Sequence, residues 1–226
     1  MLEIGPGLGS LTLALREAGA SVVALEVDAA LAAVVRDVTA DAGVRVEVGD
    51  ALTADFAGLL DGEGWRCVSN LPYNVAAPVV VRILEEAPVV ERMLVMVQRE
   101  VGERLAAPPG SDAASAVSVV VAYFGAAEVV GLVPPTVFVP RPRVESALVR
   151  IVRHAEPPVD VPSAGELFAL VHAGFGHRRK MLRRALRSRL GDRTDAVLAD
   201  AGIPGETRAE RLTLDDWGAL SRAAAA

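Results

Sequence analysis

Several residue types are rare in this chain of 226 residues, and each shortage narrows the range of possible functions. Cys67 is the single cysteine, so the chain cannot form an internal disulfide or a metal site built on paired cysteines. The three histidines, His154, His172 and His177, are scattered along the sequence, and we expect no metal site. Lys180 is the single lysine, which we attribute to the base composition of the genome.

Long uncharged runs are also missing, although 52% of the residues are hydrophobic and the mean hydropathy is +0.36. The longest stretches without charge, such as residues 113–127, are shorter than a bilayer span and contain serine and glycine. Met1 is followed almost at once by Glu3 and a glycine-rich turn, which is not the pattern of a signal peptide. We therefore expect a cytoplasmic protein that does not enter a membrane.

Positive charge is scarce in the first part of the chain and abundant in the last. Residues 1–140 contain 8 arginines and 18 acidic residues, a net charge of −10. Residues 141–226 contain 14 arginines and one lysine against 11 acidic residues, a net charge of +4. This asymmetry predicts a polyanionic partner for the last third, although a solvated helix surface would have the same composition.

Short apolar runs alternate with helix-like segments through the first two thirds of the chain. The runs are nearly continuous in apolar character, which is typical of parallel strands buried on both faces. Strands are expected over residues 1–4, 22–26, 44–48, 67–69, 93–97, 129–133 and 147–152, and helices over residues 11–17, 29–38 and 79–86. This order predicts an α/β fold with a Rossmann-like, doubly wound parallel sheet.

A cluster of prolines divides the chain. Pro157, Pro158 and Pro162 predict a linker. Beyond it, helices are expected over residues 166–173, 178–190, 194–201 and 214–221. We therefore predict an α/β domain over residues 1–156 and a small helical domain over residues 157–226.

A glycine-rich turn, Glu-Ile-Gly-Pro-Gly-Leu-Gly, starts at Glu3 and lies between the first expected strand and helix. Gly5 and Gly7 let the backbone turn sharply and approach a ligand closely. The second strand ends at Glu26, where a carboxylate can accept hydrogen bonds from both hydroxyls of a ribose. Asp50 ends the third strand, where it can meet an adenine amine. The pattern indicates a nucleotide cofactor, although a tight turn without a ligand would look the same.

Two cofactors fit this pattern, NAD and S-adenosylmethionine. NAD sites usually carry Gly-x-Gly-x-x-Gly with a helix N-terminus facing the pyrophosphate. Here the spacing is Gly-x-Gly-x-Gly, and Glu3 stands just before it. A carboxylate at that place would repel a pyrophosphate but attract the cationic amino-acid end of S-adenosylmethionine. The sequence therefore favours S-adenosylmethionine.

The sequence Asn70-Leu71-Pro72-Tyr73 follows the fourth expected strand, at the edge where doubly wound sheets bind ligands. An exocyclic amine is a poor nucleophile, because its lone pair is delocalised into the ring. The Asn70 side-chain oxygen and the Leu71 carbonyl can each accept a hydrogen bond from such an amine and favour a more tetrahedral nitrogen. Pro72 stiffens the turn, and Tyr73 offers a ring for base stacking. A proline turn capped by an asparagine is the alternative.

Positive residues are concentrated in one expected helix of the last domain. Arg179, Arg183 and Arg187 are spaced four residues apart, so they share one helix face, and Phe175 and Leu182 would anchor the helix to the core. Uncompensated like charges at this spacing destabilise a helix, which favours phosphate contacts over a plain solvated surface. The residues expected to bind RNA are Arg178, Arg179, Lys180, Arg183, Arg184 and Arg187.

Seven ordered motifs give the chain a resemblance to the ribosomal RNA adenine N6,N6-dimethyltransferases. The resemblance runs through nearly the whole chain, and its motifs match residues 2–13, 23–28, 49–52, 70–78, 96–104, 133–146 and 175–182. It implies the fold of a class I S-adenosylmethionine methyltransferase with a small C-terminal helical domain. It also implies that the cofactor is lined by Gly5, Glu26, Asp50 and Asn70.

The resemblance extends to the acceptor site and the substrate. Residues 70–73 would face the target amine, and Phe138 would stack on the other face of the base; core packing is the alternative for Phe138. The family's substrate is two adjacent adenosines near the 3′ end of 16S rRNA in the small ribosomal subunit, each of which receives two methyl groups. We expect the chain to act there as a monomer, with a role in ribosome biogenesis.

The chain departs from the family pattern in two places. The family carries a Gln-Asn-Phe-Leu segment before the first strand, which helps to cover the cofactor, whereas Met1 lies inside the first expected strand. We therefore expect that upstream residues would tighten cofactor binding. Ala114-Ser115 stands where the family often has Tyr-Gly, which puts one loop contact in question.

Three other functions remain open from the sequence. The first is a large-subunit rRNA adenine methyltransferase that confers macrolide resistance, but such relatives usually have isoleucine in place of Leu71. The second is a non-catalytic assembly or transcription factor on the same fold, against which the intact Asn70–Tyr73 turn argues. A small-molecule methyltransferase is the third, and it would not need the basic segment.

Overall fold

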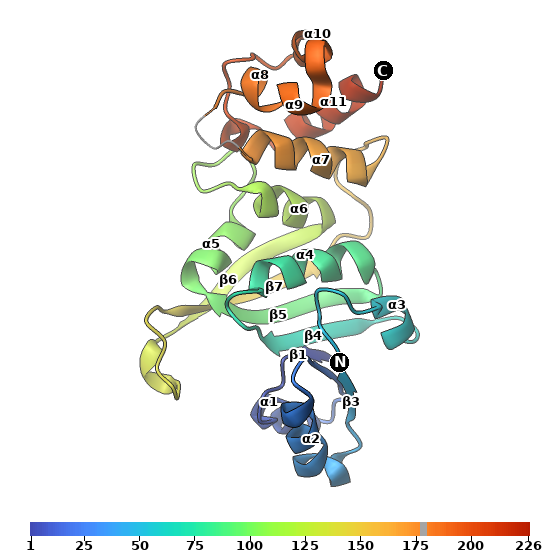
Figure 1. Ribbon diagram of the computed structural model, residues 1–226, viewed down its shortest axis with the longest axis vertical. Helices are drawn as coiled ribbons and strands as arrows, with labels where there is room; N and C mark the ends of the chain where they lie inside the picture. Colours follow the sequence, from blue (N-terminus) through green and yellow to red (C-terminus); the bar gives the residue numbers. More distant parts are fainter. Residues whose placement is uncertain (177–179) are drawn as a thin grey trace. The chain divides into compact units, whose positions relative to one another are not determined.

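The computed structural model describes residues 1–176 and 180–226 of the chain (Figure 1). The chain forms two compact units, one made of Met1–Glu103 and Ala127–Arg153, the other of Arg104–Ala126 and His154–Ala226. The chain passes between the units after Glu103, after Ala126 and after Arg153. The predicted boundary near residue 156 corresponds to the last of these. Residues 104–126 leave the first unit because they carry a buried apolar helix that packs within the second.

Seven strands in the described residues form one sheet, in the order β3-β2-β1-β4-β5-β7-β6. Their bounds are β1 Leu2–Ile4, β2 Val23–Glu26, β3 Arg45–Val48, β4 Trp65–Asn70, β5 Val90–Gln98, β6 Gly125–Val133 and β7 Ser146–Arg153. Strands β1 to β5 pair in parallel, as the sequence predicts, whereas β7 runs antiparallel to β5. The predicted α/β fold with a Rossmann-like sheet is confirmed, and β7 adds an antiparallel strand to its parallel part.

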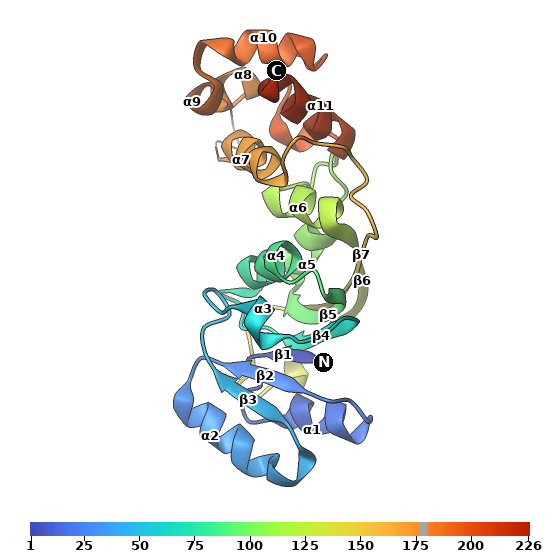
Figure 2. The same ribbon diagram turned by 90° about the vertical axis from the view of Figure 1, so that its right-hand side faces the viewer.

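Helices of the first unit lie on both faces of the sheet. They are α1 Ser10–Glu17, α2 Ala29–Val38, the single turn α3 Phe56–Leu59, α4 Ala76–Glu86 and the start of α5 Arg99–Ala106. Figures 1 and 2 show α1 and α2 on one face of the sheet and α4 on the other. Asp28 caps α2 by accepting hydrogen bonds from the backbone N–H groups of Ala30 and Leu31. Strand β2 and helix α2 share an apolar core that includes Ala24, Ala32, Val35 and Val46.

The second unit is helical. Its helices are α6 Ala116–Phe124, α7 Ala164–Phe175, α8 Leu182–Ala185, α9 Arg187–Leu190, α10 Thr194–Asp200 and α11 Leu214–Ala225, and the short 3-10 helices of the chain are η1 Ala40–Ala42, η2 Pro135–Val137, η3 Gly191–Arg193 and η4 Ala209–Arg211. Trp217 of α11 is fully buried and stacks on Phe175 of α7, with ring centroids 6.0 Å apart. No helix among the described residues is both long and apolar enough to cross a membrane.

The predicted basic helix over residues 178–190 differs from the structure. Arg178 and Arg179 lie outside the described residues. Met181 has an extended backbone, with ψ at 152°, so the helix begins only at Leu182. Leu182 is fully buried, as expected of an anchor, and its N–H donates to the carbonyl of Thr207.

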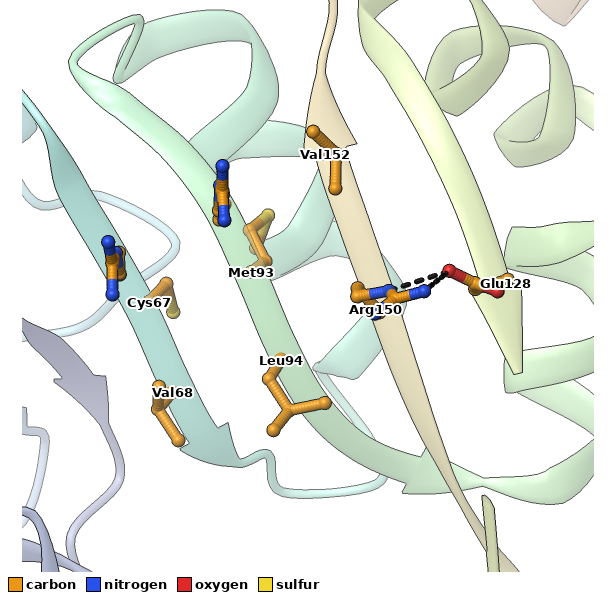
Figure 3. Close-up of a pocket in the computed structure, with 9 residues that line it drawn as sticks. Cys67, Val68, Met93, Leu94, Glu128, Arg150 and Val152 are labelled. Carbon is orange, nitrogen blue, oxygen red and sulfur yellow. Dashed lines mark hydrogen bonds and ion pairs between the residues drawn. The ribbon is translucent and has the colours of Figure 1, made fainter. Parts of the chain in front are cut away.

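The sheet face formed by β4, β5, β7 and β6 has a groove of about 370 Å³ (Figure 3). Arg66 and Arg92 lie beside each other in the strand register and line the groove. Arg150 of β7 also lines it and forms an ion pair with Glu128 of β6. Met93 and Leu94 contribute apolar surface between the charges.

Candidate active site

The glycine-rich turn between β1 and α1 adopts a backbone that other residues rarely adopt. Gly5 has φ at +67° and Gly7 at +58°, in the left-handed region. The Gly5 N–H donates to the carbonyl of Leu25, 2.9 Å away, which holds the turn beside β2. A Cβ on Gly5 would lie 3.4 Å from Cδ of Pro72, so this glycine also permits a close approach to the turn after β4.

Glu26 ends β2 as predicted, and the structure buries it beneath the glycine-rich turn. One carboxylate oxygen accepts a hydrogen bond from the N–H of Gly7 at 3.2 Å, and the other accepts from the N–H of Asp28 at 3.1 Å. Each oxygen of an ionised carboxylate can accept more than one hydrogen bond. Glu26 is therefore fixed in orientation and keeps capacity for two ribose hydroxyls.

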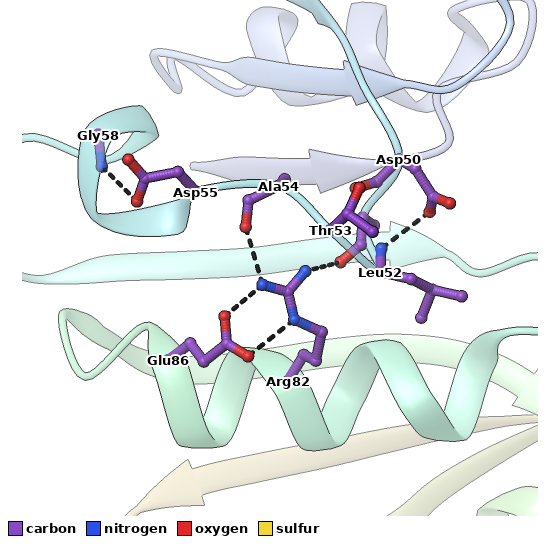
Figure 4. Close-up of polar contacts among 9 residues, drawn as sticks. Asp50, Leu52, Thr53, Ala54, Asp55, Gly58, Arg82 and Glu86 are labelled. Carbon is purple, nitrogen blue, oxygen red and sulfur yellow. Dashed lines mark hydrogen bonds and ion pairs between the residues drawn. The ribbon is translucent and has the colours of Figure 1, made fainter.

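Asp50 follows β3 in a loop that is tied to helix α4 by Arg82 (Figure 4). The Arg82 guanidinium donates to the carbonyl oxygens of Ala51 and Ala54, each at 2.9 Å, and Nε donates to Glu86 at 2.9 Å. Asp50 itself accepts a hydrogen bond from the N–H of Leu52 at 2.8 Å. No local sequence pattern indicates the role of Arg82, because its loop partners lie 28 and 31 residues away.

The predicted cofactor residues come together only in part. Gly5, Glu26 and Asp50 line one pocket, together with Pro72. Gly7 does not line that pocket, but a Cβ on Gly7 would meet no atom within 4 Å, so open space lies beside the turn. Carboxylates beside an open glycine turn fit a cofactor that carries ribose hydroxyls and a cationic amino-acid end. The residues present therefore fit S-adenosylmethionine.

Glu3 is not among the residues that line this pocket; it is buried on β1 under helix α1. Its Oε2 atom has no hydrogen-bond partner in the described part of the chain. Burial raises the pKa of Glu3 to about 7, and the nearby Thr12 hydroxyl offsets part of that rise. The expected contact of Glu3 with the cofactor's amine remains a prediction.

The predicted acceptor residues share a second pocket, of about 240 Å³. Its lining consists of Asn70, Leu71, Pro72, Tyr73, Phe138, Pro140 and Pro142. The Leu71 N–H donates to the carbonyl of Met96 at 3.1 Å, so the turn continues the pairing of β4 with β5. Pro72 lines both pockets, which makes the turn the shared wall between them.

Phe138 reaches the acceptor pocket from a segment that precedes β7. The far end of this segment is held by Arg99, whose N–H donates to the Glu145 carbonyl at 2.9 Å. The Arg99 guanidinium also donates to the Glu145 carboxylate at 2.8 Å and to Glu103 at 2.8 Å. The role of Arg99 is likewise not indicated by local sequence, because Glu145 lies 46 residues away.

The basic residues of the second unit are less free than predicted. Arg183 pairs with Asp195 at 2.6 Å and Glu206 at 3.1 Å, and Arg187 lies 3.8 Å from Asp192. The expectation of uncompensated charge is therefore wrong for these two arginines, because acids that follow them in the chain fold against them. Lys180 and Arg184 are exposed and have no ion pair among the described residues.

Known proteins resemble the chain over most of its length. The family model described as ribosomal RNA adenine dimethylase matches residues 1–225. A protein of Rhodococcus opacus named ribosomal RNA small subunit methyltransferase A is 46% identical over 222 residues, which cover 94% of this chain and 75% of the relative. A protein of the same name from Methylococcus capsulatus is 40% identical over 98% of this chain and 85% of the relative.

Solved structures agree in fold. The 23S rRNA methyltransferase ErmE has a TM-score of 0.69 and 26% identity, over 100% of this chain and 90% of that one. A dimethyladenosine transferase from Plasmodium falciparum has a TM-score of 0.74 and 22% identity, over 97% of this chain and 87% of that one. Since the family match spans nearly the whole chain and these two relatives share 40% and 46% of its residues, this protein belongs to the ribosomal RNA adenine dimethylase family of methyltransferases.

Proposed function

We propose that the protein transfers methyl groups from S-adenosylmethionine to the N6 amines of two adjacent adenosines near the 3′ end of 16S rRNA, two to each. The observation that carries this proposal is the acceptor pocket, which joins residues 70–73 to Phe138 and shares Pro72 with the cofactor pocket. The names of the relatives from Rhodococcus opacus and Methylococcus capsulatus support the small subunit as the partner. The enzyme would act there as a monomer.

The cofactor would be held by carboxylates and by the glycine-rich turn. Glu26 would accept hydrogen bonds from the ribose hydroxyls, and Asp50 from the adenine amine. Gly5 would let the ligand approach the backbone, and Asn70 would stand at the reacting end. When bound, S-adenosylmethionine supplies an electrophilic methyl group.

The acceptor turn would orient the amine. The Asn70 side chain has no hydrogen-bond partner within the residues described, so its amide oxygen is available to a substrate amine. With the Leu71 carbonyl it would draw the amine toward tetrahedral geometry and direct the nitrogen lone pair at the methyl donor. Tyr73 and Phe138 would stack on the two faces of a flipped base. No general base is required, because the nitrogen proton becomes acidic once the nitrogen is alkylated.

The second unit would dock on the RNA backbone. Lys180 and Arg184 are exposed and would contact phosphates, as would Arg178 and Arg179 from outside the described residues. Arg183 and Arg187 would have to exchange their acidic partners for phosphates. Such contacts set affinity and position and do not read sequence.

The test is methyl transfer to immature small subunits from a strain that lacks the modification, followed by mapping of the methylated nucleotides. We expect two neighbouring dimethylated adenosines in wild-type product. Asn70→Ala should abolish methylation and leave subunit binding within twofold, because it removes an acceptor from the pocket and no contact from the fold. An undiminished rate in Asn70→Ala would refute the assigned role.

Large-subunit rRNA is the second candidate substrate, and the structural likeness to ErmE over the whole chain favours it. The higher identity to small-subunit methyltransferases weighs against it. Purified large subunits in the same assay decide between the two, because only one of the subunits should accept methyl groups.

A further inference from the structure

In the segment that carries Phe138, residues that line the acceptor pocket alternate with residues that do not. Phe138, Pro140 and Pro142 line the acceptor pocket, whereas Arg141 and Arg143 between and after the prolines are exposed. The segment bends at residues 138–140 and 143–144, and it keeps both guanidinium groups out of the pocket lining. The two guanidinium groups are therefore carried by the same short segment that forms one wall of the pocket, and they face solvent.

The first unit has 11 arginines against 18 acidic residues, and seven of its other nine arginines bind a partner within the protein. Arg16, Arg36 and Arg153 donate to backbone carbonyls. Ion pairs occupy four of the others, Arg45 with Glu47, Arg82 with Glu86, Arg99 with Glu103 and Glu145, and Arg150 with Glu128. Arg141 and Arg143 have no ion pair and no side-chain hydrogen bond within the part of the chain that the structure describes. Glu145, the acid nearest in sequence, is already bound by Arg99.

Arg141 and Arg143 are unpaired cations beside the acceptor pocket, in a unit of net charge −7, which indicates that an anion from outside binds there. A base inserted into the acceptor pocket keeps its own phosphates outside, at the mouth. Guanidinium groups bind phosphate oxygens with two parallel hydrogen bonds and position a nucleic acid without reading its sequence.

We infer that Arg141 and Arg143 form a phosphate-binding rim that holds the RNA backbone on either side of the target nucleotide while its base occupies the acceptor pocket. This inference rests on the proposed function, since it takes the pocket to receive a base. It adds a second set of RNA contacts, in the unit that carries the chemistry, to those proposed for the basic segment of the second unit.

The chain offers a matched control. Arg66 and Arg92 are also exposed arginines of the first unit without an ion pair among the described residues, but they line the groove of Figure 3 and not the acceptor pocket. The double variants Arg141→Gln/Arg143→Gln and Arg66→Gln/Arg92→Gln therefore remove the same charge from the same unit at two different places.

The experiment measures binding of a fluorescent RNA hairpin that contains the two adjacent adenosines, at several salt concentrations, by anisotropy. We expect Arg141→Gln/Arg143→Gln to weaken binding by about tenfold or more and to reduce the slope of log affinity against log salt by about 1.4, at about 0.7 per lost contact to single-stranded RNA. Calorimetric affinity for S-adenosylmethionine should not change. Arg66→Gln/Arg92→Gln should bind as wild type, and Arg141→Lys/Arg143→Lys should recover most of the affinity.

The proposed phosphate-binding rim would be refuted if both glutamine variants lost RNA affinity equally, or if Arg141→Gln/Arg143→Gln lost none. The binding readout is independent of methylation, so the two proposals fail separately. A wild-type protein that binds the hairpin through Arg141 and Arg143 but methylates no small subunit would keep the rim and refute the proposed function. A wild-type protein that methylates the small subunit but does not bind the hairpin would refute the rim and keep the proposed function.

Discussion

The hydroxyl of Tyr73 lies 2.7 Å from the hydroxyl of Ser146, at hydrogen-bond distance. Tyr73 belongs to the acceptor turn after β4, and Ser146 is the buried first residue of β7. The bond therefore joins the turn that would orient the amine to the end of the segment that carries Phe138. It fixes the Tyr73 ring at one end and leaves its face to the pocket.

Substitutions at Tyr73 separate the ring from the hydroxyl. Tyr73→Phe keeps the face for base stacking and loses only the bond to Ser146, so we expect kcat/KM for RNA to fall less than tenfold. Tyr73→Ala removes the stacking surface, which contributes about 1–3 kcal/mol per base, and should lower kcat/KM by roughly 5- to 150-fold. Steady-state methylation of small subunits measures both. An equal fall in kcat/KM in the two variants would show that methylation depends on the hydroxyl and not on the ring.

Arg82 should act on cofactor affinity through the Asp50 loop. Arg82→Met removes the hydrogen bonds to the carbonyls of Ala51 and Ala54, and we expect KM for S-adenosylmethionine to rise about tenfold while kcat changes less than threefold. Arg82→Lys should recover part of the affinity, since an ammonium can reach one carbonyl.

Arg153→Met is the control for Arg82→Met. Arg153 donates to the carbonyls of Ile83, Leu84 and Ala87 at the C-terminal end of the same helix, whereas Arg82 holds the loop after Asp50. Its loss should lower the melting temperature without raising KM for S-adenosylmethionine. A rise in KM for both variants would mean that the effect reports general loss of stability.

Glu3 should make the protein less stable as pH rises. Its pKa is about 7 in the folded protein against 4.5 for an ordinary glutamate, so between these values the unfolded chain releases a proton that the folded chain retains. Stability from this group is fully present below pH 4.5, falls as pH rises, and levels off above pH 7, with a total loss of about 3 kcal/mol at most.

Glu3→Gln tests this dependence, because the amide does not ionise. Urea unfolding at pH 5 and pH 8 should show a smaller loss of stability in Glu3→Gln than in wild type. Glu17→Gln, at the exposed end of α1, should keep the wild-type difference. If wild type and Glu3→Gln lost the same stability between pH 5 and pH 8, Glu3 would not be the source of the pH dependence.

Two glycines of helix α7 should respond in opposite directions to alanine. A Cβ on Gly174 would lie 2.7 Å from the buried ring of Trp217, so Gly174→Ala should lower the free energy of unfolding by about 1–3 kcal/mol. A Cβ on Gly165 would lie 3.7 Å from Oγ of Ser163, an ordinary contact. Gly165→Ala should raise stability by about 0.5–1 kcal/mol. Thermal unfolding compares the two, and destabilisation of similar size would argue against the Trp217 contact.

The sequence predicted the parts of the site that depend on one residue type at the end of one strand. Glu26 and Asn70 end strands β2 and β4, Asp50 follows β3, and parallel strands bring such ends to one edge of a sheet. Gly5 was also predictable, because few other residues adopt its backbone. These positions require no knowledge of distant partners.

Other features depend on contacts between residues far apart in sequence and could not be predicted. Arg82 and Ser146 have site partners 28 to 73 residues away, and no local pattern indicates them. Helix α6 is rich in valine, which favours strands, and its helical form comes from burial against other helices. The ion pairs of Arg183 could not be predicted either, because Asp195 and Glu206 come close to it only in the folded chain.

The interleaving of the two units limits how this enzyme can be recombined with its relatives. Helix α6 contacts α7 and α11, and Val119, Val120 and Val121 are buried there. A chimaera spliced at a single junction after Arg153 would separate α6 from its own partners and present it to foreign ones. A chimaera that keeps the helical unit intact must therefore take two segments, Arg104–Ala126 and His154–Ala226, from the same parent.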